Sequence, residues 1–336
     1  MILIRGAGDI ASGIALRLFR CGFTLAMTDL TKPTSIRRTV CLSEAILHGS
    51  CTVEGVTAER AFSLDDAKDI WQRGHIPVFA DDDGAVLALL RPEAVVDARL
   101  AKVNLDTSLT DAPIVVAVGP GFTAGQDCHA VVETQRGHYL GRVIYEGSAA
   151  PNTGVPGNIG GYTVERIIRA PRAGVFHPVR AIGDQVAAGE TVAYVDEEPV
   201  TCQITGTLRG ILPEGTEVHQ GMKSGDVDPR CKPEHCLCAS DKALSVGGGA
   251  LEALLHFGYR ESAKGPLQSS PIVSERQIAK VFQQYLDAQQ DQNDTAQQLR
   301  LALVFRAEDA ADLHAQGGKQ ESDHADEADR GQDADL

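Results

Sequence analysis

The first 20 residues constrain the fold most strongly, because they join a short strand to a helix through a glycine-rich turn. Ile2–Arg5 is a largely apolar strand, GAGDIASG is the turn, and residues 14–19 are expected to continue as a helix. Gly6, Gly8 and Ala11 have the spacing G-x-G-x-x-G/A. Between a strand and a helix, this spacing is typical of dinucleotide-binding folds.

Two further apolar segments, residues 76–80 and 94–98, are typical of buried strands in a parallel sheet. With the N-terminal unit they predict a Rossmann-like α/β domain with a parallel sheet over residues 1–165. Arg37 and Arg38 precede an expected helix at 42–48. Paired guanidinium groups suit phosphate or carboxylate contacts, and a solvated surface pair is the alternative.

The N-terminal turn is also a candidate cofactor site. Asp29 ends the next expected strand, about 20 residues on, where a ribose-binding carboxylate is found in such folds. Asp9 places a carboxylate inside the turn, where it would repel a pyrophosphate. The glycines therefore either bind a dinucleotide or only allow close packing, with Asp9 and Ser12 capping the helix. The candidate cofactor-binding residues here are Gly6, Gly8, Asp9, Ser12, Gly13 and Asp29.

A second candidate site lies in the glycine-rich region from Val115 to Gly161. An apolar strand at 114–118 ends in Gly-Pro-Gly, and ligands usually collect at that edge of an α/β sheet. The following loops carry charged groups and one histidine, which suits a phosphate- or pterin-bearing ligand; a hairpin with surface ion pairs is the alternative. The catalytic candidates are Glu133, Arg136 and His138, and the binding candidates are Gly119, Gly121, Asn152 and Thr153.

The middle of the chain repeats itself with an offset of 32 residues, since the segment from Ala173 aligns with that from Thr205. Each copy contains G-x-x-V-x-x-G between two short strands, so two copies are expected to pair into one small β-domain over residues 166–230. The pattern resembles the biotinyl/lipoyl-type hammerhead. No lysine occurs between Ala173 and Met222, so neither biotin nor lipoate is expected, and a binding or docking role is predicted.

Charged and thiol groups cluster directly after the repeat. A turn forced by Pro229 is expected to present a ligand-facing loop. The thiols that follow are crowded as in metal sites, but C-x4-C-x-C lacks paired C-x2-C spacing, which favours ordinary thiols. The binding candidates are Lys223, Asp226, Asp228, Arg230 and Lys242, and the metal candidates are Cys231, Cys236 and Cys238.

The C-terminal part is expected to be helical over residues 231–310. Gly247–Gly249 precede a predicted helix at 250–257, either as an anion site at its N-terminus or to permit close packing. A capping box at Ser274 and Gln277 predicts a further amphipathic helix that packs on the body. Residues 311–336 are acidic and almost without large apolar side chains, which predicts a disordered tail.

The formal net charge of −15 argues against nucleic acid or an anionic membrane as a partner. No apolar run reaches about 18 residues, the length a membrane span needs. The chain begins in a strand-like segment without the layout of a signal peptide, so a cytoplasmic location is expected. The eight cysteines are then expected to be reduced.

Several long motifs occur along the chain, among them GAGDIASG, GPGFTAG, VETQRGH, PNTGVPG and SGDVDPR. Together they resemble the accessory-protein family linked to selenium-dependent molybdenum hydroxylases. The resemblance spans about residues 1–260, and the cysteines near Cys231 and the acidic tail depart from it. It implies an accessory protein that matures or inserts the molybdenum-pterin cofactor, with an apo-hydroxylase as partner, rather than a stand-alone enzyme. If sulfur or selenium transfer occurs, the candidate carrier is Cys238, close in sequence to Lys242, as a thiolate of lowered pKa.

Three functions remain open at this point. In the first, the chain handles a pterin-dinucleotide cofactor or another nucleotide-type small molecule. In the second, it is an NAD(P)-dependent oxidoreductase in which Gly6, Gly8 and Asp29 hold the dinucleotide and His138 is the acid/base group. In the third, it is a non-catalytic docking scaffold. A homo-oligomer is compatible with each.

Overall fold

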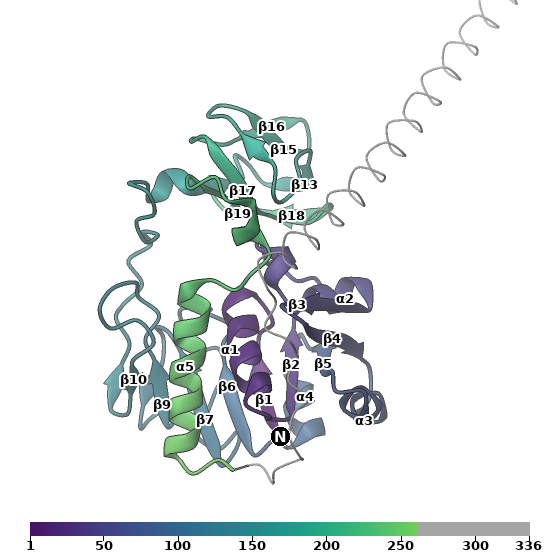
Figure 1. The fold of residues 1–336 in the computed structure, drawn as a ribbon, viewed down its shortest axis with the longest axis vertical. Helices are drawn as coiled ribbons and strands as arrows, with labels where there is room; N and C mark the ends of the chain where they lie inside the picture. Colours follow the sequence, from purple (N-terminus) through teal and green to yellow (C-terminus); the bar gives the residue numbers. More distant parts are fainter. Residues whose placement is uncertain (261–336) are drawn as a thin grey trace, which may run out of the picture. The chain divides into compact units, whose positions relative to one another are not determined.

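The computed structural model of the chain describes residues 1–260 (Figure 1). The expected amphipathic helix after Ser274 and the expected acidic tail lie outside the described residues, as does the part of the predicted helical segment beyond residue 260. Within residues 1–260, none of the helices is long and apolar enough to cross a lipid bilayer.

The large sheet has nine strands within the described residues, and most neighbours run parallel. This confirms the α/β class and the predicted strands at its centre. Only the two edge strands, β10 and β3, are antiparallel to their neighbours. In spatial order the strands are β10 (Val143–Ile144), β9 (Ala130–Val132), β7 (Ile114–Val118), β6 (Ala94–Asp97), β1 (Ile2–Arg5), β2 (Leu25–Asp29), β5 (Ile76–Ala80), β4 (Val56–Ala61) and β3 (Ser50–Val53).

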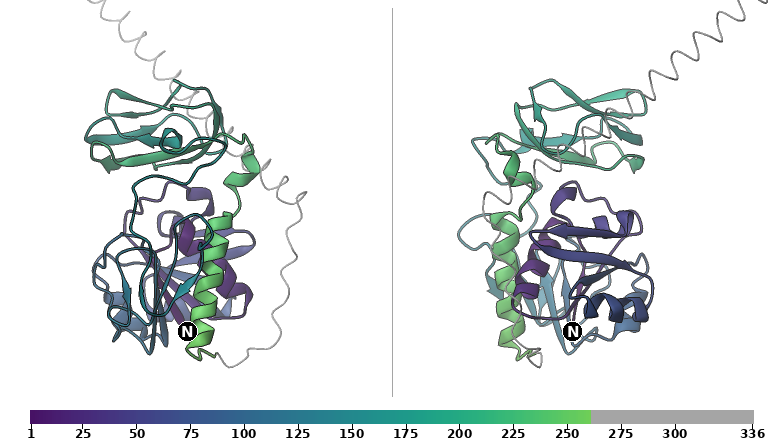
Figure 2. Two further views of the ribbon diagram at one scale, coloured as in Figure 1. Left: turned by 90° about the vertical axis from the view of Figure 1, so that its left-hand side faces the viewer. Right: turned by 45° about the vertical axis from the view of Figure 1, so that its right-hand side comes forward.

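Helices cover both faces of this sheet, because alternate residues of each strand point to opposite faces. On one face, α1 (Asp9–Arg20), α2 (Glu44–His48) and α5 (Asp241–His256) pack on residues such as Ile4 and Val116. On the other, α3 (Leu64–Gln72) and α4 (Ala85–Leu90) pack on residues such as Leu3 and Val115. Figures 1 and 2 show α1 and α5 side by side.

The predicted glycine loop before a helix at 250–257 is wrong, because Gly247–Gly249 lie in the middle of α5. The alternative interpretation, close packing, fits the structure. A Cβ atom on Gly247 would lie 2.9 Å from the Gly13 carbonyl oxygen of α1. On Gly249 it would lie 2.3 Å from the carbonyl oxygen of Gly141. Glycine is therefore required where α5 meets its neighbours, and the three residues form no anion site at a helix N-terminus.

Strands β12–β19, which we call the β-module, form two four-stranded sheets around a separate apolar core. The two repeat copies share these sheets: β13 of the first copy pairs with β18 of the second, and β14 with β17. Neither copy therefore completes a sheet alone. The sheets are β12 (Ile167–Arg169), β19 (Lys223–Asp228), β17 (Gly206–Ile211) and β14 (Gln185–Val186), and β16 (Glu198–Thr201), β15 (Thr191–Val195), β13 (Gly174–Pro178) and β18 (Thr216–Val218).

Short elements connect these parts. Strands β8 (Thr123–Ala124) and β11 (Gly147–Ser148) form a small antiparallel pair. The 3-10 helices η1 (Arg38–Val40), η2 (Val164–Arg166) and η3 (Pro233–Cys236) lie in the connections. Residues 36–39 bond to the β-module and to η3: the Ile211 amide donates to the Ile36 carbonyl (2.8 Å), and the Thr39 hydroxyl donates to the Cys236 carbonyl (2.5 Å).

Candidate functional site

A cavity of about 930 Å³, which we call the cleft, lies at the carboxyl ends of strands β1, β2, β5 and β6. Its other walls come from the loop at 150–157, from Arg166 at the end of η2 and from β-module residues including Arg209. The carboxyl edge of a parallel sheet is the usual ligand-binding position in α/β folds. The cleft is therefore the leading candidate site.

The cleft brings together ten of the residues singled out from the sequence, from both predicted sites and from the segment after the repeat. They are Gly6, Gly8, Asp9, Asp29, Arg136, Asn152, Thr153, Lys223, Asp226 and Lys242. The others do not line it. They are Ser12, Gly13, Gly119, Gly121, Glu133, His138, Asp228, Arg230, Cys231, Cys236 and Cys238.

The three catalytic candidates are not assembled into one site. Glu133 is buried, and its two oxygens accept hydrogen bonds from the Gln135 amide (2.6 Å) and the Ala150 amide (2.8 Å). This carboxylate shapes its own loop. His138 is exposed and packs edge-on against Tyr139. Only Arg136 reaches the cleft.

The glycines after β7 serve the chain's own packing. A Cβ atom on Gly119 would lie 2.9 Å from the Thr134 hydroxyl, and one on Gly121 would lie 2.6 Å from the Val103 Cα. Both have positive φ, which glycine adopts without strain. They let two loops approach each other and do not contact the cleft.

Hydrogen bonds with neighbouring side chains hold the backbone of the N-terminal turn. Asp29 accepts a hydrogen bond from the Ala7 amide (2.8 Å), so one of its oxygens is engaged by the turn, and burial raises its pKa. The expectation that Asp9 and Ser12 cap α1 is wrong. Gly8 is the N-cap residue, and the fully buried Ser12 hydroxyl donates to the Ala7 carbonyl and accepts from the Leu42 amide. Gly13 faces α5, where a Cβ atom would lie 2.5 Å from the Cβ of Ala243.

Arg37 is not the solvated surface group of one sequence interpretation, because it is buried and bonded within the chain. Its guanidinium lies 3.3 Å from Asp9 and donates to the carbonyls of His235 (3.1 Å) and Cys238 (3.3 Å). Its two terminal nitrogens are engaged within the chain in this way, and the residue lines the cleft. Its charge offsets the Asp9 carboxylate that stands at the start of α1.

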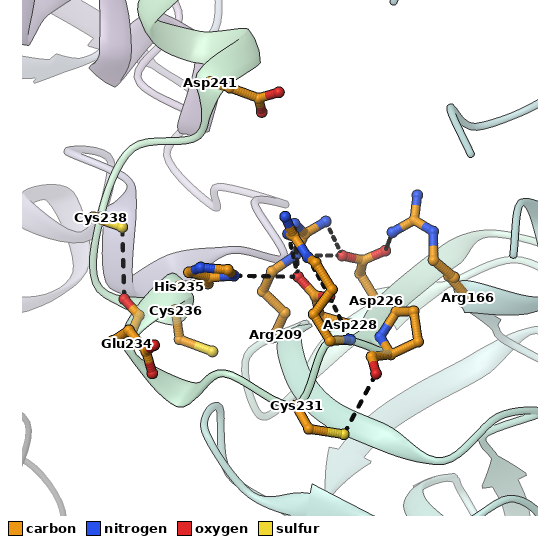
Figure 3. Close-up of polar contacts among 12 residues, drawn as sticks. Arg166, Arg209, Asp226, Asp228, Cys231, Glu234, His235, Cys236, Cys238 and Asp241 are labelled. Atoms are coloured by element: carbon orange, nitrogen blue, oxygen red, sulfur yellow. Dashed lines mark hydrogen bonds and ion pairs between the residues drawn. The ribbon is translucent and has the colours of Figure 1, made fainter. Parts of the chain in front are cut away.

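Lys223 to Asp228 form strand β19 and not the irregular loop expected from Pro229, because both β12 and β17 pair with this segment. Asp226 is 2% exposed and lies between Arg166, at 3.0 Å, and Arg209, which it binds through two nitrogens. Figure 3 shows this cluster, with Asp228 next to it. The sequence signal that could have found it is a lone arginine inside the apolar strand GTLRGI, whose repeat partner carries none.

Asp228 gives the first testable prediction, a dependence of stability on pH. Burial alone would raise its pKa, but hydrogen bonds from Arg230 and the charge of Arg209 outweigh burial and lower the pKa to about 2. A depressed pKa stabilises the fold above the unfolded pKa of about 4, and the contribution is lost as the pH falls from about 4 towards 2. Denaturant unfolding should show wild type more stable than Asp228→Asn at pH 6, with the difference shrinking below pH 4. A difference that stays constant to pH 2 would contradict this.

The clustered thiols point in different directions. The sulfur atoms of Cys231, Cys236 and Cys238 each approach a different backbone carbonyl, and Cys236 is buried. Residues 1–260 contain no group of three His, Cys, Asp or Glu side chains that could hold a metal ion. Burial raises the pKa of Cys236 to about 12 and also raises that of Cys238. This is the opposite of the lowered pKa that thiolate transfer chemistry at Cys238 requires.

The Escherichia coli strain K12 protein named "Uncharacterized protein YqeB" is 51% identical to this chain over 255 residues. The match covers 76% of this chain and 47% of that protein, so the chain spans about half the length of this relative. The chain is thus similar to that protein over the part that the two share. No protein-family profile matches the chain.

Three solved structures were also compared. An aspartoacylase family protein from Mesorhizobium loti has 12% identity and a TM-score of 0.22, covering 67% of this chain and 83% of that one. The ectoine utilization protein EutE (DoeB) from Ruegeria pomeroyi has 12% identity and a TM-score of 0.21, covering 67% and 84%. A succinylglutamate desuccinylase/aspartoacylase from Rhodobacter sphaeroides has 22% identity and a TM-score of 0.17, covering 19% and 21%.

Proposed function

We propose that the cleft binds a nucleotide-bearing, anionic cofactor and that the chain acts as an accessory protein of a selenium-dependent molybdenum hydroxylase. The cofactor would be the molybdenum-pterin cofactor, handled before its insertion into the apo-hydroxylase. The observation that carries the proposal is one cleft that joins the glycine turn at α1 to cationic groups of α5 and the β-module. The resemblance of the motifs to that accessory family supports the same role.

A Rossmann-like arrangement of the sheet supports nucleotide binding. The parallel strands β5, β2, β1, β6, β7 and β9 lie in the order 3-2-1-4-5-6 if numbered as in dinucleotide-binding folds. In such sheets the ligand lies where the strand order reverses, here between β1 and β6. Gly6 and Ala98, which directly follow these two strands, both line the cleft.

The cleft offers less support for an NAD(P)-dependent oxidoreductase. No histidine of residues 1–260 lines it, and His138 lies outside it. The β-module, with its pattern similar to a lysine-less hammerhead, is proposed to hold part of the ligand and to dock the hydroxylase.

Calorimetric titration of the full chain with a pterin dinucleotide, CTP and NAD⁺ tests this proposal. We expect the pterin dinucleotide to bind most tightly. Gly8→Val should weaken binding, because it adds bulk where Gly8 and Ser35 line the cleft: its Cβ would lie 3.2 Å from the Ser35 hydroxyl oxygen, while the φ of −69° suits any residue. Gly248→Ala, half-buried in α5 and outside the cleft, is the control and should bind as wild type. Binding of NAD⁺ alone would favour the oxidoreductase, and no binding would favour the docking scaffold.

A further inference from the structure

Two lysines that line the cleft have no counter-charge of their own. Lys223 is the first residue of β19, in the β-module, and Lys242 is the second residue of α5. Within residues 1–260 the ammonium group of neither lysine forms a hydrogen bond or an ion pair; the Lys223 side chain is exposed and that of Lys242 is half-buried. Desolvation by the surrounding protein lowers the pKa of both, and their charges repel each other. An anion bound between them would relieve this.

The carboxylates near these lysines are already engaged by arginines. Asp241 accepts two hydrogen bonds from Arg136, at 2.7 and 2.8 Å. Asp226 lies between two buried guanidinium groups, and Asp9 pairs with Arg37. The two lysines therefore supply positive charge in excess of local pairing, in a chain whose net charge is −15.

Two helix N-termini open onto the same cleft. Residues of the first turn of α1, including Gly8 and Ile10, line it, and so do Ser240 and Lys242 at the start of α5. The first amides of a helix lack intrahelical acceptors and carry partial positive charge. They add hydrogen-bond donors to the two ammonium groups.

The walls of the cleft beyond β2 and β5 have the opposite character. Asp29, Asp81 and Asp82 line it there, and burial raises the pKa of Asp29 and of Asp81. Carboxylates that are costly to ionise do not favour an added anion, but they accept hydrogen bonds from hydroxyl and amino groups. The charge distribution thus gives a bound ligand one preferred orientation.

We propose that Lys223 and Lys242 form a diphosphate subsite, with the hydroxyl-bearing end of the same ligand directed towards Asp29 and Asp81. The inference rests on the proposed function, because it assigns one part of the same cleft. Lys223 belongs to the β-module and Lys242 to α5. A diphosphate bound to both lysines therefore contacts both of these walls of the cleft.

Titration of the full chain with inorganic pyrophosphate tests the subsite directly. Lys223→Met and Lys242→Met should each weaken binding about tenfold, the effect of losing one charge-assisted hydrogen bond. Lys242→Arg, which keeps the charge, should retain most of the affinity. Lys32→Met is the matched control, because Lys32 is exposed and does not line the cleft, so the same substitution there should leave binding unchanged. Thermal unfolding of each variant confirms that it folds.

The outcomes separate this inference from the proposed function. Suppose that the pterin dinucleotide binds, and that neither methionine variant weakens the binding of the dinucleotide or of pyrophosphate. The subsite is then wrong while the proposed function stands. If pyrophosphate binds wild type, depends on both lysines and no nucleotide binds, the subsite is supported and the proposed ligand is wrong. Equal weakening by Lys32→Met, or no pyrophosphate binding by wild type, overturns the subsite.

Discussion

Replacing Gly249 with alanine is expected to destabilise the protein by about 1–3 kcal/mol, the usual effect of forcing extra atoms into a packed core. The added Cβ would lie 2.3 Å from the Gly141 carbonyl oxygen and 2.7 Å from a methyl group of Val132. One contact is with backbone, so relief requires α5 to move away from β9 and β10. Thermal and denaturant unfolding measure the loss.

The neighbouring Gly248 provides the matched control. It lies in the same helix, but a Cβ atom there would meet no atom within 4 Å. Gly248→Ala should therefore stabilise the protein by about 0.5–1 kcal/mol through helix propensity and the lower entropy of the unfolded chain. Similar changes in both variants would show that close packing is not what requires glycine at Gly249.

The parts of the fold that the sequence predicted correctly depend on local signals. The strand at Ile2–Arg5, the glycine turn and the following helix are adjacent in the chain, and β5, β6 and β7 are short apolar runs. The internal repeat likewise predicted that its two copies pair through their strands, because its glycines and valines recur at a fixed offset. Such signals do not depend on partners distant in sequence.

The sequence predictions were wrong where contacts between residues far apart in the chain override the local conformational preference. Three consecutive glycines favour a loop, yet in α5 they are helical because α1 and the Gly141 loop approach closely there. Glu133 has the residue type of a general base, but the Ala150 amide, 17 residues away, occupies one of its oxygens. Only the folded chain shows that such a group is committed to structure.

Some residues of the cleft could be predicted because local sequence signals place them at the ends of strands. Asp9 and Asp29 follow the ends of strands, where a parallel sheet presents its ligand-binding edge. Arg166 and Arg209 carried no motif, and their meeting at Asp226 depends on the register of β17, β19 and the chain before β12. A charged side chain at the centre of a buried strand is the general signal for such a pair.

The buried ion pairs of Asp226 with Arg166 and Arg209 give the second prediction with a large expected effect, a loss of stability. Asp226→Ala should destabilise the protein by about 3–5 kcal/mol, because breaking a buried ion pair leaves uncompensated charge in the interior. Here the side chains of Arg166 and Arg209 are only 5% and 10% exposed, and both would lose their shared carboxylate. Urea unfolding at neutral pH measures the difference. Asp65→Asn is the comparison, since Asp65 forms an exposed pair with Lys68 and its loss should have little effect.

A double variant separates unpaired charge from lost packing. Arg209→Met combined with Asp226→Leu removes both charges and keeps similar volume, so it should be more stable than Asp226→Ala alone. Arg166 still loses its partner, but its terminal nitrogen also donates to the Gly157 carbonyl, 3.2 Å away, and this contact holds it at the edge of the cleft. If the double variant is no more stable than Asp226→Ala, the loss reflects packing around β19. In that case buried charge is not what fixes this wall of the cleft.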